Sequence, residues 1–329
     1  MQTAPMKNNP VSSIRIGFGD YISKMKRQDD IHRVNGIPDY AFSLDLQLRE
    51  QIRKLPYFYA LSKRVAEHEE ARYRQVMTAS ALQVGPKQLP DIYEMTIECA
   101  KRLGIGPPNV FVVHDQSINA ATYASDTTTP TIMIHSGLIE RVTPGELKCV
   151  IAHECGHIHN EHNVYMSIAN LVQTGLAVGG LVNTVFSFLS QAALILIAEW
   201  SRAAEVTCDR AAMICSDNTD DAINVNKKLL YGTFLGRDDE LNIDDIRSQF
   251  EHISSTISVF TEMYQSHPSS IRRVLASDEF THCDILYKWR PELKKPGMEL
   301  RTKEESDKIC AKYTAVFKEA RKGKIGNER

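Results

Sequence analysis

The stretch Val150-Ile-Ala-His-Glu-Cys-Gly-His-Ile-His159 contains the pentad H-E-x-x-H, in which His153, Glu154 and His157 hold the fixed positions. On an α-helix, residues four apart lie on one face about one turn from each other, so both imidazoles can bind the same metal ion. Glu154 follows the first imidazole and can accept a proton from a metal-bound water. The pentad therefore predicts two nitrogen ligands, an open position and a base, which is the arrangement of a zinc hydrolase.

The residues before the pentad predict that it lies on a buried helix. Thr143 and Glu146 stand three apart in the pattern of a capping box, which marks a helix start. Leu147, Val150 and Ile151 follow at the spacing of one apolar helix face. We therefore expect the metal site inside the molecule rather than on its surface.

A third protein ligand must come from elsewhere in the chain, and Glu205 is the candidate. It lies in residues 199–213, an alanine-rich stretch without glycine or proline that predicts a second helix. Asp209 is four residues further on and shares a face with it, so its carboxylate can accept the N–H of a metal-bound imidazole. We place Asp209 and Arg202 behind the ligands rather than on the metal. The alternative is that both carboxylates pair with Arg202 or Arg210 on a solvated face.

Three segments in order resemble the HtpX and CAAX prenyl protease family of zinc metallopeptidases, most of all its soluble bacterial members. They are His153-Glu-Cys-Gly-His-Ile-His-Asn-Glu-His162, Ser201-Arg-Ala-Ala-Glu-Val-Thr-Cys-Asp-Arg210 and Ser266-His-Pro-Ser-Ser-Ile-Arg-Arg-Val274. The resemblance runs from about residue 88 to about residue 275. It implies a gluzincin fold and one zinc ion per chain, bound by His153, His157 and Glu205. It also implies that Glu154 is the general base of peptide hydrolysis.

Two positions depart from the pattern of this family. Cys208 stands where a small residue such as alanine is usual. The segment Asn119-Ala-Ala-Thr-Tyr-Ala-Ser125 has the family's Asn-Ala start but lacks a glycine that often follows, which leaves the shape of the substrate cleft open. Cys155 and Cys208 both stand next to the predicted site, where a redox role or a place as fourth ligand is an alternative to the small buried thiols that we expect.

The composition is that of a globular protein with a full hydrophobic core, since 43% of its 329 residues are hydrophobic and 24% are charged. A formal net charge of −2 without a basic stripe predicts no nucleic-acid partner. The seven cysteines are scattered and form no C-x-x-C pair, which is typical of a reducing compartment. Residues 1–10 lack the continuous apolar segment of a signal peptide, so we expect a cytoplasmic location.

The remaining pattern, with the resemblance, predicts an α+β fold: a mostly helical gluzincin metallopeptidase core with a small β-sheet beside the H-E-x-x-H helix. Residues 89–103 form an amphipathic helix with proline near its start and glycine after its end. Residues 107–113 and 131–135 are rich in β-branched side chains and predict strands. We expect a helical support region over 1–85, the zinc metallopeptidase domain over 86–282, and a Lys-rich, exposed helical tail over 283–329.

An extended, uncharged segment lies between the two predicted strands. It comprises Asn119, Ala120, Ala121, Thr122 and Tyr123. A strand edge beside a zinc helix can hold a peptide in extended form by pairing with its backbone. We predict that these residues line the substrate cleft. The alternative is an ordinary sheet edge without a role in binding.

His267 is a candidate for a further role at the site. Pro268 predicts that it stands just ahead of a helix start, and a histidine from a distant segment can stabilise an oxyanion opposite the metal. It could equally bind zinc in a resting enzyme, or be a structural histidine. We expect His162 at the helix end or behind the ligands, and His159 at the surface.

Residues 163–198 contain no Asp, Glu, Lys or Arg, which invites a membrane interpretation. The helices on both sides must reach one metal ion, so membrane crossings must be even in number, and the segment is too short for two spans of about 20 residues each. We expect two buried helices, 164–178 and 181–200. The alternative is a helical hairpin that contacts a membrane surface or a partner chain.

The chain is thus predicted to be a zinc metalloendopeptidase that hydrolyses protein or peptide substrates, with protein quality control as one candidate setting. The alternative is a non-proteolytic zinc-binding interaction module that uses the apolar 163–198 hairpin. A structural zinc site is closed by four protein ligands, whereas a catalytic site keeps an open position, and this difference separates the two hypotheses. The sequence gives neither the substrate nor the oligomeric state.

Overall fold

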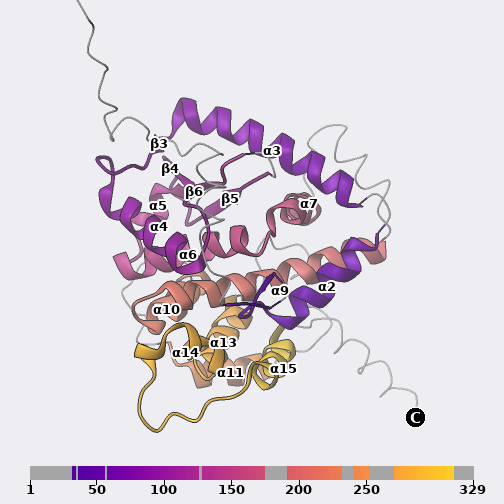
Figure 1. Cartoon of the computed structure of the whole chain (residues 1–329), viewed down its shortest axis with the longest axis vertical. Coiled ribbons are helices and arrows are strands. Elements are labelled where there is room, and N and C mark those ends of the chain that lie inside the picture. The colour runs from indigo at the N-terminus through magenta and orange to yellow at the C-terminus, as the bar shows by residue number, and fades with distance from the viewer. Residues whose placement is uncertain are drawn as a thin grey trace, which may run out of the picture.

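The computed structural model describes residues 32–34, 36–55, 58–125, 128–174, 191–231, 241–251 and 270–314. Most of these residues are helical, and the strands form one two-stranded and one four-stranded sheet. The predicted α+β class, a mostly helical core with a small sheet beside the H-E-x-x-H helix, is confirmed. Figure 1 shows the sheet between a long helix above it and the helices that carry the candidate site below it.

The four-stranded sheet has the order β3-β4-β6-β5. Its strands are β3 (Leu82–Gln83), β4 (Asn109–Val113), β5 (Ala120–Tyr123) and β6 (Thr131–His135). β4 and β6 are parallel, and the other two pairs are antiparallel. Among the described residues β5 pairs with β6 alone, so it forms one edge of the sheet. A short hairpin near the N-terminus, β1 (Arg33–Val34) and β2 (Ile37–Pro38), makes the second sheet.

Helix α6, Pro144–His159, carries the pentad and begins with the predicted capping box. The Thr143 hydroxyl accepts a hydrogen bond of 3.3 Å from the backbone N–H of Glu146, whose carboxylate accepts one of 2.7 Å from the backbone N–H of Thr143. Every residue from Glu146 to His159 is buried. The helix therefore runs through the interior, because both its polar and its apolar faces are covered.

Helix α9, Gln191–Cys215, packs against α6 and carries the second set of predicted site residues. A Cβ atom on Gly156 would lie 2.9 Å from the Ala211 side chain and 3.1 Å from the Cα of Cys208, so glycine permits this close approach. We predicted one helix ending near Trp200 and another beginning there, which is wrong. A single helix continues through Trp200 because the sequence there has neither glycine nor proline to end it.

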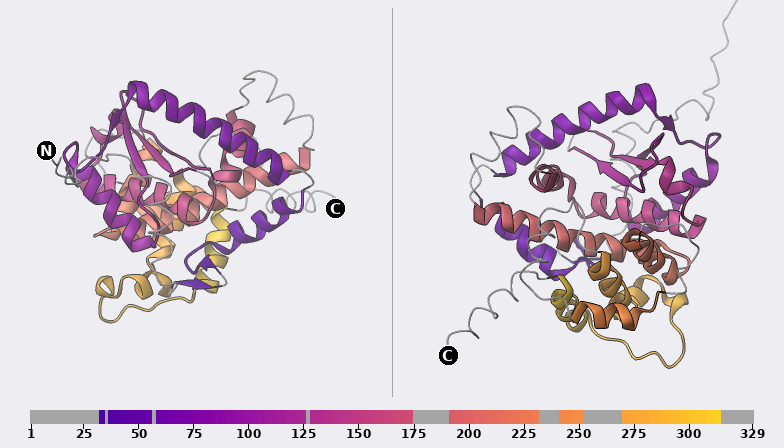
Figure 2. Two further views of the ribbon diagram at one scale, coloured as in Figure 1. Left: turned by 45° about the horizontal axis from the view of Figure 1, so that its top comes forward. Right: turned by 180° about the vertical axis from the view of Figure 1, so that it is seen from behind.

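Helix α3, Phe58–Ser80, lies across the sheet on the side opposite α6 (Figures 1 and 2). Helix α7, Asn163–Thr174, packs between α3 and α9, and α2, Ser43–Arg53, packs on α9. The remaining helices of this half are α4 (Pro90–Leu103) and α5 (Ser136–Ile139). None of the helices in the described ranges is long and apolar enough to cross a membrane. Residues 175–190 of the predicted hairpin lie outside those ranges.

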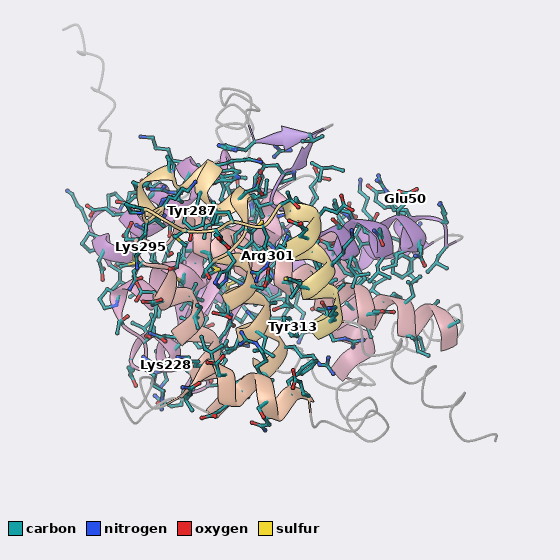
Figure 3. The ribbon with its side chains drawn as sticks, turned by 90° about the horizontal axis from the view of Figure 1, so that it is seen from below. Glu50, Lys228, Tyr287, Lys295, Arg301 and Tyr313 are labelled. Atoms are coloured by element: carbon teal, nitrogen blue, oxygen red, sulfur yellow. The ribbon has the colours of Figure 1, made fainter. Side chains whose placement is uncertain are left out.

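The C-terminal elements form the lower face of the molecule. They are α10 (Thr219–Tyr231), α11 (Ile243–Glu251), α13 (Ser270–Phe280), α14 (Asp284–Trp289), the 3-10 helix Pro291–Leu293 and α15 (Lys303–Thr314). Figure 3 shows this face, with Arg301 just before α15 and Tyr313 near its end. We predicted an exposed tail helix, which is wrong for α15. Its Cys310 is fully buried, and its Asp307 forms an ion pair of 2.7 Å with buried Arg210.

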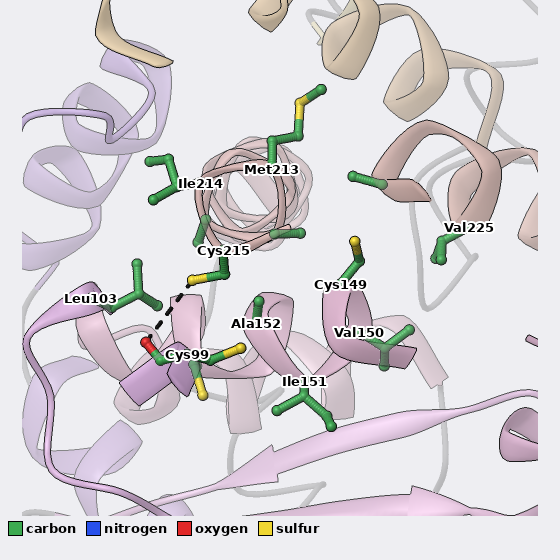
Figure 4. Packing of buried hydrophobic residues seen from close by; sticks show 14 of the residues in the cluster. Cys99, Leu103, Cys149, Val150, Ile151, Ala152, Met213, Ile214, Cys215 and Val225 are labelled. Carbon is green, nitrogen blue, oxygen red and sulfur yellow. Dashed lines mark hydrogen bonds between the residues drawn. The ribbon is translucent and has the colours of Figure 1, made fainter. Parts of the chain in front are cut away.

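The main hydrophobic core lies where α4, α6 and α9 meet the sheet (Figure 4). Small side chains fill the contact between these helices. The thiol of Cys215 donates a hydrogen bond of 3.9 Å to the carbonyl oxygen of Cys99, and Cys149 lies beside them. All seven cysteines are buried and free of disulfide bonds, so they behave here as small hydrophobic residues.

Candidate active site

The two histidines of the pentad point their Nε2 atoms at the carboxylate of Glu205. The His153 Nε2 lies 3.4 Å from one oxygen of that carboxylate, and the His157 Nε2 lies 3.5 Å from the other. Zinc bonds of about 2.1 Å at tetrahedral angles separate ligand atoms by about 3.4 Å. The distance from each imidazole to the carboxylate thus fits binding to one zinc ion, and the three groups have the chemistry of a zinc site. Glu205 is only 4% exposed, so the solvated-face alternative is wrong.

Asp209 lies behind His153, at the place where we predicted it. Its Oδ1 is 3.0 Å from the Nδ1 of His153, which leaves the Nε2 atom of the ring free to face Glu205. Burial lowers the pKa of His153, but hydrogen bonds to Asp209 and Glu205 outweigh it and raise that pKa to about 9. The two carboxylates therefore favour a positive charge at this point, whether a proton or a metal cation supplies it.

Arg273 on α13 contacts the carboxylates of both Asp209 and Glu205. Its Nε and Nη2 atoms donate to the two oxygens of Asp209 at 2.9 and 2.6 Å, and its Nη1 lies 3.3 Å from Glu205. Burial raises the pKa of Asp209, but Arg273 holds it below its usual value. We expected Arg202 in this position; Arg202 is buried, and the contact with both carboxylates is made by Arg273.

The other ring nitrogen of His157 faces a second buried group. The His157 Nδ1 lies 3.2 Å from the Nδ1 of His162, whose Nε2 lies 3.0 Å from Oδ2 of Asp45. Asp45 also accepts hydrogen bonds from Trp200 Nε1 at 2.9 Å and from the Thr207 hydroxyl at 2.8 Å. Burial raises the pKa of Asp45, yet its neighbours, His162 first, lower it to about 2. Burial lowers the pKa of His162 to about 4, so its imidazole is neutral near pH 7.

Cys208 competes with Glu205 for the place of third ligand. Its thiol, His153 and His157 offer ligand atoms within 4.8 Å of one another. Two observations favour Glu205. Both Nε2 atoms lie 3.4–3.5 Å from the carboxylate, whereas the thiol lies 3.5 Å from the Nδ1 of His162, the nitrogen that faces the Nδ1 of His157. Burial also raises the pKa of Cys208 well above its usual value, which disfavours the thiolate that a metal would need.

Glu154 points toward the edge strand of the sheet. Its Oε2 accepts a hydrogen bond of 2.6 Å from the hydroxyl of Thr122 on β5, and its side chain is almost fully buried. The neighbouring Tyr123 stacks on Tyr73 of α3 with ring centroids 4.0 Å apart. The predicted substrate segment therefore lies beside the candidate base, between α6 and α3.

A cavity of about 250 Å³ opens beside Glu154 and Ala120, the first residue of β5. His153, Glu205, Asp209 and Arg273 form its polar side, and Asn119 and Ala120 form the entrance to the strand. The rest of the lining is mostly apolar and comprises Ile118, Leu138, Cys149, Val150, Ala212, Ala222, Val225, Asn226 and Leu229. The site thus combines a buried polar end with a hydrophobic hollow.

The sequence also led to predictions for His267 and His159. His267 lies in 252–269, outside the described residues, so its proposed role stays a prediction. We predicted His159 at the surface, which is wrong. It is 4% exposed and its Nδ1 lies 2.9 Å from the hydroxyl of Tyr40, because the N-terminal segment covers the end of α6.

Comparisons with known proteins find relatives of this chain among proteases. The chain is 32% identical over 209 residues to a plastoglobule-localized metallopeptidase 48 from Arabidopsis thaliana, covering 60% of this chain and 59% of that protein. It is 35% identical over 111 residues to protease HtpX homolog 1 of Sulfurisphaera tokodaii, covering 33% of this chain and 32% of that protein. The chain therefore spans about three fifths of the first relative and about a third of the second.

This chain is also similar to a protein of known structure. A crystal structure of Ste24p from S. mikatae aligns with 72% of this chain and 62% of its own length, at 16% identity and a TM-score of 0.36. The description of the matching family model is peptidase family M48, and the match confirms the resemblance that the three sequence segments indicated. Because that model covers residues 86–280, more than half of the chain, the chain belongs to peptidase family M48.

Proposed function

We propose that this chain is a zinc-dependent metalloendopeptidase that hydrolyses peptide bonds in protein substrates. The observation that carries the proposal is that the Nε2 atoms of His153 and His157 lie 3.4 and 3.5 Å from the Glu205 carboxylate, with Glu154 in the same cavity wall. Two imidazole nitrogens and one carboxylate leave a fourth position for water, as catalytic zinc sites do. Membership of a peptidase family supports the same reaction.

Each residue has a distinct role in the proposed reaction. His153, His157 and Glu205 would hold the zinc ion, which would supply a Lewis acid that makes the attacking water more acidic. Glu154 would accept the proton of the attacking water and deliver it to the leaving amine. Asp209 keeps the His153 Nδ1 protonated, and Arg273 keeps Asp209 ionised. We retain His267 as the proposed group that stabilises the oxyanion.

We infer that the substrate lies in extended form along β5. This strand is an edge in the described part of the sheet, and its Thr122 touches the proposed base. Pairing between a peptide backbone and a strand edge binds many sequences alike, so side-chain pockets must supply selectivity. Asn119, Ala120, Ala121, Thr122 and Tyr123 are the residues that we propose to contact the peptide.

The cavity at the start of β5 favours an apolar substrate side chain next to the cleaved bond. Its mostly apolar wall accepts a leucine- or phenylalanine-sized group, and its polar end faces the reacting atoms. Replacing Val225 by phenylalanine would narrow the hollow. We expect kcat/KM for peptides with phenylalanine at this position to fall about tenfold, with alanine peptides nearly unchanged. A parallel loss for both peptide series would reject this assignment.

A second cavity of about 340 Å³ lies beyond the other end of β5, where Ala124 and Ser125 line it. Three arginines, Arg33, Arg49 and Arg53, line it together with one acidic residue, Glu161. The excess of positive charge favours an acidic substrate side chain several residues from the cleaved bond. The proposed substrate is therefore an extended segment with an apolar residue at the cleaved bond and an acidic residue further along.

Peptide kinetics can test the charge preference with a matched pair of variants. Arg53→Gln removes a cation that lines the second cavity, whereas Lys54→Gln removes the neighbouring cation, which is 72% exposed and does not line it. We expect Arg53→Gln to lower the preference for acidic over neutral peptides about threefold, since an exposed pair contributes under about 1 kcal/mol. Equal effects from both variants would refute a specific role for the cavity.

The central experiment combines metal analysis with a protease assay. Zinc would be measured in the purified protein by elemental analysis, and cleavage of an unfolded protein such as β-casein would be followed with and without a chelator. We expect one zinc per chain, loss of cleavage on chelation and recovery on adding zinc back. Zinc that is bound while cleavage never occurs would favour the non-proteolytic alternative. The cytoplasmic location stays a prediction.

A further inference from the structure

We propose that Asp45 and His162 are positioning residues that hold the zinc-binding nitrogen of His157 in place. The inference rests on the proposed function, because it assumes that His157 binds the metal through Nε2. It assigns a role at the site to α2, which lies outside the 86–280 range of the family match.

The three side chains form one continuous line of hydrogen bonds. The Nδ1 atoms of His157 and His162 are 3.2 Å apart, and the Nε2 of His162 lies 3.0 Å from Asp45. His162 and Asp45 are both 0% exposed, and His157 is 6% exposed. Water cannot replace any hydrogen-bonding partner in this buried line. Each donor therefore needs the acceptor that the structure supplies.

The positions of the protons follow from this arrangement. A His157 that binds metal through Nε2 carries its proton on Nδ1, so this nitrogen donates to His162. The His162 Nδ1 must then accept, and its Nε2 carries the proton that Asp45 accepts. The carboxylate thus selects one tautomer of His162, and that tautomer in turn fits only the metal-binding tautomer of His157.

Asp45 is itself held by two further donors. Trp200 and Thr207, both on α9, donate to its two oxygens at 2.9 and 2.8 Å. The Trp200 ring also meets the His162 ring edge-on, with centroids 5.8 Å apart at 88°. Asp45 therefore has a fixed orientation, which a carboxylate needs if it is to direct one proton.

The backbone between the two histidines is shaped to bring them together. Glu161 adopts the left-handed conformation with φ of 57°, which is uncommon for a residue other than glycine. The chain turns back after α6, and the His162 N–H donates to the carbonyl oxygen of His157 at 3.0 Å. This left-handed residue directly precedes His162, so the turn that ends α6 returns His162 to the side of His157.

The support of His157 is the counterpart of the support of His153. Asp209 contacts the Nδ1 of His153 directly, at 3.0 Å, whereas Asp45 acts on the Nδ1 of His157 through His162. The thiol of Cys208 lies 3.5 Å from the same His162 nitrogen, farther than the His157 Nδ1 at 3.2 Å. Each zinc-binding imidazole is thus backed by a buried carboxylate.

Zinc retention tests this inference independently of catalysis. Asp45→Asn and His162→Phe would be loaded with zinc, and the zinc affinity would be measured by competition with a chromophoric chelator. Thermal unfolding of the metal-free proteins would be measured alongside. We expect both variants to bind zinc 10- to 100-fold more weakly than the wild type, as losses of such supporting residues do. His162→Gln, which can both donate and accept, should recover part of the affinity.

Asp307→Asn is the matched control, because Asp307 is also a buried carboxylate but pairs with Arg210 instead of the histidine line. It should lower the unfolding temperature without changing zinc affinity. Thr207→Val, which removes a single donor to Asp45, gives a milder variant if Asp45→Asn fails to fold. Wild-type zinc affinity in all these variants would overturn the inference and leave the proposed function standing. A wild type that binds zinc without cleaving would overturn the function alone, and one that binds no zinc would overturn both.

Discussion

The hydroxyl of Thr122 on β5 lies 2.6 Å from the Oε2 of Glu154 on α6. The strand proposed to hold the substrate therefore also holds the proposed base. A hydroxyl that donates to one carboxylate oxygen fixes the rotamer of the glutamate and leaves the other oxygen available for a proton. Substrate binding along β5 and proton transfer at Glu154 are thus connected through one side chain.

Thr122→Val removes this hydrogen bond while keeping the shape of the side chain. We expect kcat to fall about tenfold, because the carboxylate loses one fixed orientation, and zinc content to stay unchanged. Thr122→Ser keeps the hydroxyl and should stay close to wild type. Steady-state kinetics on one peptide substrate measures the difference. A loss confined to the serine variant would show that the methyl group, not the hydroxyl, matters.

The identity of the third ligand can be settled by comparing two variants on α9. Glu205→Gln should lose most of the bound zinc, because a neutral amide replaces the carboxylate between His153 and His157. Cys208→Ala should retain it, since the Nε2 atoms of both histidines face Glu205, whereas the Cys208 thiol contacts His162. Elemental analysis of both proteins after dialysis provides the measurement. Zinc lost from the alanine variant and kept by the glutamine variant would make Cys208 the ligand instead.

The buried pair of Arg210 and Asp307 gives a prediction for stability and pH. Burial raises the pKa of Asp307, but Arg210 outweighs it and holds that pKa below its usual value. The ionised carboxylate therefore stabilises the fold above the unfolded pKa of about 3.9, and this contribution is lost as pH falls through the folded pKa. We expect Asp307→Asn to lower the free energy of unfolding by about 3 kcal/mol at pH 7. The difference from wild type should shrink below about pH 4 in chemical denaturation. A difference that stays constant with pH would refute the assignment.

Much of the site could be predicted from local patterns. The H-E-x-x-H spacing and the capping box at Thr143 fix helix α6, and four-residue spacing puts Glu205 and Asp209 on one face of α9. These features depend on residues close together in sequence, where helix geometry converts spacing into position. The strands 109–113 and 131–135 were also predictable from local sequence, because both are rich in β-branched residues.

The supporting residues Asp45 and Arg273 could not be predicted, because they come from distant segments. Asp45 lies 117 positions from His162, and Arg273 lies 64 from Asp209. A lone aspartate on an amphipathic helix gives no local signal of such contacts, whereas the Ser266–Val274 segment did single out the region of Arg273. The same limit explains His159 and α15, whose burial depends on Tyr40 and Arg210 of other elements. Tertiary packing, rather than periodicity, decides these positions.

The most direct test of the account is the variant Glu154→Gln, analysed for both zinc and cleavage. Glu154 is not among the proposed ligands, so the variant should retain as much zinc as the wild type. Its cleavage of an unfolded protein should fall about 100- to 10,000-fold, because an amide cannot accept the proton of the attacking water. A variant that holds its zinc and still cleaves at the wild-type rate would contradict the account.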